Sequence, residues 1–131
     1  LLGLEADALL RGAEAGPMIP RDGALLGHLF ESLVTLDVRV HAQAAEATVK
    51  HLRLQNGRRE IDLIVERPDQ RIVAVEVKLS AAITDDDVRH LLWLREKIGE
   101  DFLDGVVVNT GPQAYRRKDG IAVVPAALLG P

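Results

Sequence analysis

The chain has 131 residues, of which 47% are hydrophobic and 27% are charged, a composition that indicates a globular domain and excludes a disordered or fibrous protein. It contains no cysteine, which excludes disulfide bonds, thiolate metal sites and a cysteine nucleophile, so we expect a cytoplasmic protein. The net charge of −4 at pH 7 argues against bulk attraction to nucleic acid or anionic lipid but allows a local basic groove. No apolar run approaches the roughly 20 residues of a membrane-spanning helix, and no membrane partner is expected.

Residues 1–24 are expected to form an N-terminal segment, with a short helix from Leu4 to Arg11 and then a loop. Glycine and proline residues interrupt any regular structure in that loop: Gly12, Gly16, Pro17 and Pro20. The main domain is expected over residues 25–131. Because the sequence begins with Leu1 rather than Met, we expect it to be a fragment of a longer protein.

The main domain is predicted to begin with a helix over residues 25–40, with Asp22 as its N-cap. Apolar residues recur in it at the i, i+3, i+4 and i+7 positions that form one buried stripe: Leu26, Leu29, Phe30 and Leu33. Strands are then predicted at residues 47–54, 59–66 and 71–79.

Turn sequences separate these strands. Asn56-Gly57 predicts a two-residue hairpin turn, because both residues tolerate a positive φ. Pro68-Asp69-Gln70 predicts a three-residue loop. A second helix is predicted from Thr84 to Gly99, and we interpret Asp85, Asp86 and Asp87 as favourable charges at its positive end rather than as a metal cluster.

The remaining strands are predicted at residues 105–109 and 121–124, with a polar loop between them. The first of these is continuously apolar, as expected for a strand that is covered on both faces. The element order is therefore α-β-β-β-α-β-β. This order predicts an α/β fold of the α+β type, with helices packed on one mixed sheet.

Acidic residues stand on the second and third predicted strands, where burial disfavours charge. Regular alternation would turn Ile61, Leu63 and Val65 to one face of residues 59–66 and Glu60, Asp62 and Ile64 to the other. In residues 71–79 it would turn Glu76 and Lys78 away from a core face formed by Val73, Val75, Val77 and Leu79.

Counting back from the Pro68–Gln70 loop places Asp62 directly opposite Glu76, with their Cβ atoms about 5 Å apart. Two opposed carboxylates repel each other unless a cation lies between them, and oxygen ligands suit a hard divalent ion. The pattern predicts Mg²⁺ or Mn²⁺ at Asp62 and Glu76. The carbonyl oxygen of Val77 is a further candidate ligand, and Lys78 would lie beside the ion.

The sequence Asp62…Glu76-Val77-Lys78 resembles the PD-(D/E)xK nuclease motif, with Ile61 in place of the proline, and the element order resembles the restriction-endonuclease-like α-β-β-β-α-β core. Other segments resemble a more specific family, the restriction-endonuclease-like domain of unknown function at the C-terminus of many prokaryotic AAA-type ATPases. These segments are Gly27-His28-Leu29-Phe30-Glu31-Ser32, Glu60-Ile61-Asp62-Leu63-Ile64, Asp104-Gly105-Val106-Val107, and Gly120-Ile121 running to Pro125.

The resemblance implies a metal-dependent nuclease that hydrolyses phosphodiester bonds of nucleic acid, DNA rather than RNA. It also implies an N-terminal ATPase region in the same chain, through which the protein could oligomerise. Asp62 and Glu76 would bind the metal, Lys78 would orient or activate the attacking water, and Glu31 would add a further carboxylate. Basic residues near two turns are candidates for contacts with phosphates: Arg58, Arg59, Arg116, Arg117 and Lys118.

Two other functions stay open at this stage. One is a catalytically inactive module that keeps the nuclease fold for DNA binding, protein docking or regulation of the ATPase, which the negative net charge and scarce aromatic residues favour. The other is a hydrolase of small phosphorylated molecules, which would need a closed pocket. Near the candidate site, His51 is expected opposite Asp62, and Arg53 is expected to form a cross-strand ion pair with Glu60.

Overall fold

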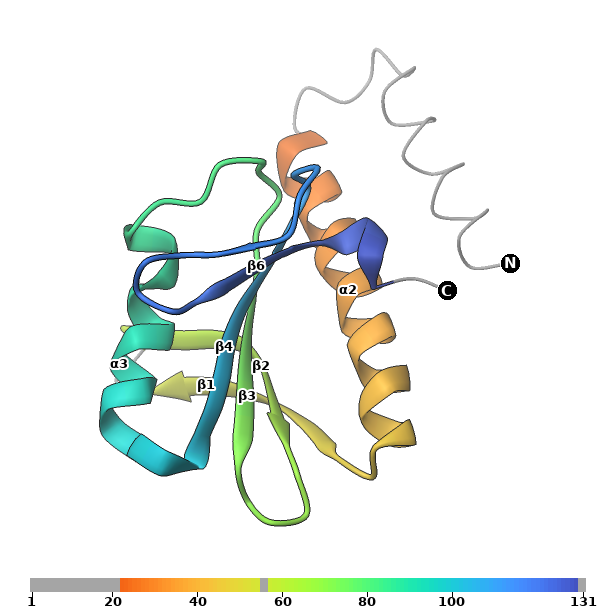
Figure 1. Cartoon of the computed structure of the whole chain (residues 1–131). Coiled ribbons are helices and arrows are strands. Elements are labelled where there is room, and N and C mark those ends of the chain that lie inside the picture. Colours follow the sequence, from red (N-terminus) through yellow and green to blue (C-terminus); the bar gives the residue numbers. More distant parts are fainter. Residues whose placement is uncertain (1–21, 55–56, 130–131) are drawn as a thin grey trace.

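The computed structural model describes residues 22–54 and 57–129 (Figure 1). The helix predicted from Leu4 to Arg11 and Asn56 of the predicted turn lie outside these residues. The helices and strands are α2 (Asp22–Ala44), β1 (Thr48–Leu54), β2 (Arg59–Glu66), β3 (Ile72–Val77), α3 (Arg89–Ile98), β4 (Phe102–Asn109), β5 (Tyr115–Arg116) and β6 (Ala122–Pro125), with short 3₁₀ helices η1 (Asp86–Val88), η2 (Gly99–Asp101) and η3 (Ala126–Leu128). Within the described residues, no helix is both long and apolar enough to cross a membrane.

The strands form one six-stranded sheet in the order β1-β2-β3-β4-β6-β5. The β1–β2, β2–β3 and β5–β6 pairs are antiparallel, whereas β4 runs parallel to both β3 and β6. Helix α2 covers one face of the sheet and α3 covers the other (Figure 1). The predicted α/β architecture with a mixed sheet is confirmed.

The turn between β2 and β3 sets the register of the central hairpin. The backbone N–H of Arg67 donates to the carbonyl of Arg71 at 2.9 Å, and the N–H of Gln70 donates back to the carbonyl of Arg67 at 2.9 Å. Gln70 has a φ of 69°, the left-handed conformation that closes a three-residue hairpin loop. The predicted three-residue loop is therefore confirmed, and Leu63 pairs with Val75 as that loop requires.

Several element predictions differ from the structure. The helix predicted from Thr84 begins only at Arg89, after the 3₁₀ helix η1, and the strand predicted at residues 105–109 begins earlier, at Phe102. Helix α2 begins at Asp22 and extends to Ala44, so Asp22 is its first residue rather than a cap that precedes it. The loop predicted before the last strand contains β5, a two-residue edge strand in which Tyr115 pairs with Val123. A two-residue strand is too short to show an alternating hydrophobic pattern, so the sequence gives no signal for it. Its formation depends on pairing with the neighbouring strand β6.

The core has one layer on each side of the sheet. Between the sheet and α3, the buried residues include Ile61, Ala74, Val107 and, from the helix, Leu91 and Leu94. On the α2 side, Val34 of the helix packs on a separate layer of sheet residues: Leu63, Val75 and Val108. Leu79, predicted to belong to the core, is 43% exposed, because β3 ends two residues earlier at Val77.

Val75→Ala is expected to lower the free energy of unfolding by about 1–3 kcal/mol, through lost burial and a residual cavity. Val75 is only 5% exposed and packs on the α2 side of the sheet. Urea denaturation measures the change, and Val40→Ala is the matched control because Val40 is 59% exposed on α2. Equal stability of the two variants would contradict the placement of Val75 in the core.

Candidate active site

A β-bulge in β2 positions Asp62. Lys50 pairs with Ile64 and Leu52 pairs with Ile61, so His51 alone faces both Asp62 and Leu63. As a result, Ile61 joins the core layer beneath α3 while Leu63 joins the layer beneath α2. The prediction that Ile61 and Leu63 share one face is wrong, because a bulge inserts one extra residue and shifts the alternation.

Strand β2 parts from β3 at the bulge. The last paired residues there are Leu63 and Val75, so the ladder ends one step before Asp62 and Glu76, which the predicted register would place opposite each other. The backbone N–H of Val77 donates to Oδ2 of Asp62 at 2.8 Å. The Asp62 carboxylate therefore takes the place of a backbone acceptor where the ladder between the two strands ends.

The carboxyl group of Glu76 has one partner, the backbone N–H of Asp62, and one oxygen atom that has none within the described residues. Its Oε1 atom is buried and makes no hydrogen bond with that part of the chain. Burial, followed by the negative charge of Asp62, raises the pKa of Glu76 to about 8. In the absence of a cation, this carboxyl group is therefore mostly protonated at neutral pH.

Asp62 and Glu31 complete an acidic cluster, defined here as Glu31, Asp62 and Glu76. Burial raises the pKa of Asp62, the hydrogen bond from the Val77 amide opposes this effect, and the negative charges of Glu31 and Glu60 raise it further. Glu31 also raises the pKa of Glu76. Glu31, on helix α2, is thus within electrostatic reach of both strand carboxyl groups, as its predicted role requires.

Lys78 is the first residue after β3, and its side chain contacts η1, the 3₁₀ helix that precedes α3. Its Nζ atom forms an ion pair with Oδ1 of Asp87 at 3.3 Å, and its side chain is 49% exposed. The carboxylate of Asp87 is itself fixed, because Oδ2 accepts the backbone N–H of Thr84 at 2.8 Å. Burial tends to raise the pKa of Asp87, but hydrogen bonds from Thr84 and Lys78 hold it below its usual value.

Residues 26–129 match the model of a family described as Domain of unknown function (DUF4143). The chain belongs to this family. No curated protein and no solved structure matches the sequence. The match covers α2 from Leu26 onward and every strand of the sheet, so the acidic cluster lies within the DUF4143 domain.

The three consecutive aspartates of this DUF4143 domain form ion pairs with three different basic side chains. Asp85 pairs with Arg117, Asp86 pairs with Arg89, and Asp87 pairs with Lys78. The sequence pattern indicates favourable charges at a helix start but not the contact between Asp87 and Lys78. Thr84 and Asp87 are three positions apart, as the two residues of a capping box are. This spacing is the sequence signal for the hydrogen bond from the Thr84 N–H to the Asp87 carboxylate.

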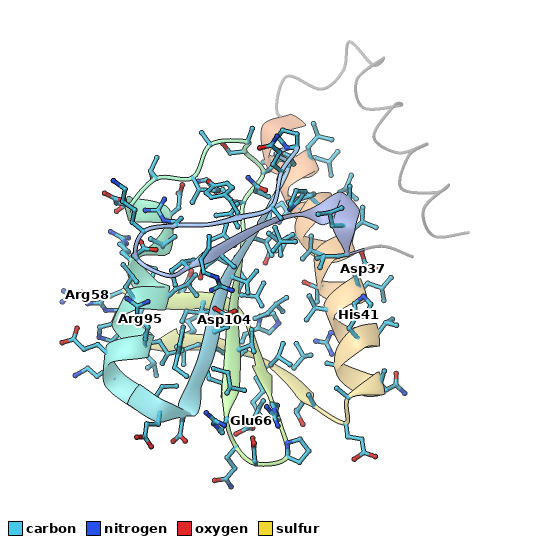
Figure 2. The ribbon with its side chains drawn as sticks, in the orientation of Figure 1. Asp37, His41, Arg58, Glu66, Arg95 and Asp104 are labelled. Atoms are coloured by element: carbon cyan, nitrogen blue, oxygen red, sulfur yellow. The ribbon has the colours of Figure 1, made fainter. Side chains whose placement is uncertain are left out.

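Several of the predicted phosphate-binding residues make internal contacts. Arg116 binds both carboxylate oxygens of Asp104 at 2.9 and 3.1 Å, and Figure 2 shows Asp104 over the middle of the sheet. Arg117 pairs with Asp85 and Asp119, and the guanidinium of Arg59 lies 4.9 Å from the centre of the Trp93 ring. Arg58, which projects from the α3 side of the molecule (Figure 2), and Lys118 are exposed.

The donor atoms of the site fit a divalent cation that keeps much of its water. In the described part of the chain, no group of three or more histidine and acidic side chains is arranged to hold a metal ion. Mg²⁺ usually takes one or two protein carboxylates and completes its shell with water and substrate oxygens. Asp62 and Glu76 supply such a pair, and the unpartnered buried Oε1 of Glu76 is the atom that a cation would satisfy.

Two further sequence predictions describe the rim of the site. Arg53 Nε lies 3.1 Å from Oε1 of Glu60, which confirms the expected cross-strand ion pair. His51 borders the site as expected, but through its ring: Nδ1 is hydrogen-bonded to the backbone carbonyl of Asp62. A carbonyl oxygen only accepts, so Nδ1 carries the proton in this contact.

Proposed function

We propose that this DUF4143 domain is a metal-dependent nuclease domain that hydrolyses phosphodiester bonds of nucleic acid, DNA in preference to RNA, and acts with an AAA-type ATPase region of the same chain. The observation that carries the proposal is the buried, unpartnered carboxyl oxygen of Glu76 on the strand beside Asp62. A protein has little reason to bury two neighbouring acids unless they bind a cation or do chemistry. The cysteine-free sequence suits the reducing cytoplasm.

The topology supports a restriction-endonuclease-like core. A helix precedes three antiparallel strands, and a second helix leads to β4, which runs parallel to β3. This arrangement has the α-β-β-β-α-β order that the sequence resembles. The acids lie on the central hairpin of that core, where β2 leaves β3.

The proposed roles follow from the contacts. Asp62 and Glu76 would hold Mg²⁺ or Mn²⁺, with Glu31 adding negative charge from α2. The bound ion would polarise the scissile phosphate and lower the pKa of a water molecule. Glu76 must lose its proton to act as a ligand, and Lys78 would stabilise negative charge that develops on the phosphate. To do so, its ammonium group must reach the phosphate from its position beside Asp87.

A second candidate function is an inactive module with the nuclease fold, used for DNA binding, docking or regulation of the ATPase. The ion pair between Lys78 and Asp87 favours it, because the lysine of an active site would otherwise be directed at substrate. The internal ion pairs of Arg116 and Arg117 point the same way, since they leave less positive charge for phosphates.

A cleavage assay separates the two candidates. The purified chain is incubated with single- and double-stranded DNA and RNA in Mg²⁺, in Mn²⁺ and in EDTA. The proposal predicts slow cleavage that requires the divalent ion and that is about 10²- to 10³-fold slower in the Lys78→Ala protein. Binding of nucleic acid without metal-dependent cleavage, with the ATPase region attached as well as without it, would favour the inactive module.

A further inference from the structure

We propose that His51 is a positioning residue that holds the bulge of β2 in place and so sets the direction of the Asp62 carboxylate. The inference rests on the proposed function for its catalytic meaning, because Asp62 is a metal ligand only under that proposal. The structural part of the inference, that His51 fixes Asp62, stands on contacts that involve no metal.

The His51 ring donates a hydrogen bond to the backbone of β2 at the bulge. One residue of β1 faces two residues of β2, so a backbone group of the extra residue loses its partner in the ladder. We infer that the carbonyl of Asp62 is the group left without a backbone donor, because the Nδ1–H of the His51 ring donates to it. The ring therefore replaces a missing backbone donor at the residue whose side chain carries the proposed chemistry.

Asp62 is consequently held at both ends. Its backbone carbonyl accepts from the His51 ring on the β1 side, and its Oδ2 accepts the Val77 amide on the β3 side. The two contacts lie on opposite sides of β2 and limit rotation of the residue between them. Loss of the His51 contact would free the carbonyl and let the carboxylate drift from Val77 and Glu76. Groups that orient a metal ligand in this way commonly change metal affinity or activity about 10- to 100-fold when they are removed.

The test compares three variants of the full chain. His51→Leu removes the donor, whereas His51→Asn keeps an N–H close to the position of Nδ1 and lacks Nε2. Lys50→Leu is the matched control, because Lys50 is the preceding residue of β1 and makes a cross-strand ion pair with Glu66 away from the bulge. Hydrogen exchange of the Val77 amide reports the position of the Asp62 carboxylate, and Mn²⁺ titration reports metal affinity.

For His51→Leu we expect exchange of the Val77 amide to be at least about 10-fold faster and the Kd for Mn²⁺ to rise about 10- to 100-fold. His51→Asn should restore both values to near those of the wild type, and Lys50→Leu should change neither. Unchanged exchange at Val77 in a folded His51→Leu protein would overturn the inference, as would failure of His51→Asn to restore it. Faster exchange in a protein whose wild type binds no Mn²⁺ would retain the positioning role and refute the proposed function instead.

Discussion

Asp62→Asn is expected to abolish metal binding and cleavage together, whereas Lys78→Ala is expected to slow cleavage about 10²- to 10³-fold and leave metal binding intact. The two side chains differ in what they would contact. Asp62 supplies negative charge to the cation, while Lys78 supplies positive charge to the phosphate. Lys78 is not a ligand under the proposal and its positive charge can only oppose a bound cation, so Mg²⁺ affinity should stay the same or rise slightly without it.

Single-turnover cleavage rates and calorimetric Mg²⁺ titration measure the two effects separately. Asp69→Asn is the matched control, because Asp69 lies in the β2–β3 loop and pairs with Arg67 far along the hairpin from the cluster. It should cleave and bind metal like the wild type. Equal cleavage by wild type and Lys78→Ala would point to a contaminating nuclease and would favour the inactive module.

Glu76→Gln is expected to raise the free energy of unfolding by about 1–3 kcal/mol near pH 8 in EDTA, and to change it little near pH 5. The folded pKa of Glu76 is about 8, above its ordinary value of 4.5, with burial as the main cause. The stability that its neutral form contributes is complete below the unfolded pKa and is lost as the pH rises through the folded pKa. Wild-type stability should therefore fall across this interval, and the glutamine variant should lose that part of the pH dependence.

Urea denaturation at several pH values between about 5 and 8 checks this expectation. Glu96→Gln is the control, because Glu96 is exposed on α3, and this variant should follow the wild-type curve. A Glu76→Gln protein that is less stable than the wild type at every pH would contradict the assignment of Glu76 as a buried, mostly protonated acid.

The central hairpin could be predicted from sequence because its determinants are local. The alternation and flanking turn residues give β2 its full extent, Arg59–Glu66. The Pro68-Asp69-Gln70 loop fixes the register of the pairs from Glu66–Ile72 to Leu63–Val75. Gly99 also ends α3 as predicted, with a φ of 56° that suits glycine.

The bulge and the partner of Lys78 could not be predicted in the same way. The bulge depends on how β1 pairs with β2, and a regular count through Asn56-Gly57 gives the pairs from Leu54–Arg59 to Leu52–Ile61 but not the shift at His51. The contact between Lys78 and Asp87 joins the loop after β3 to η1, and their relative position depends on the packing of α3 on the sheet. Both features adjust the site itself, where local sequence rules often give way to functional geometry.

The most direct test of the account is the number of protons released when the wild-type protein binds Mn²⁺. Because Glu76 is mostly protonated at neutral pH in the metal-free protein, binding of a cation to its carboxylate must displace that proton. Calorimetric titration in buffers of different ionisation enthalpy gives the count. The account predicts release of about one proton per ion near pH 7 and close to none near pH 9, above the pKa of Glu76. Absence of Mn²⁺ binding, or a proton count that is the same at both pH values, would contradict a metal site at Asp62 and Glu76.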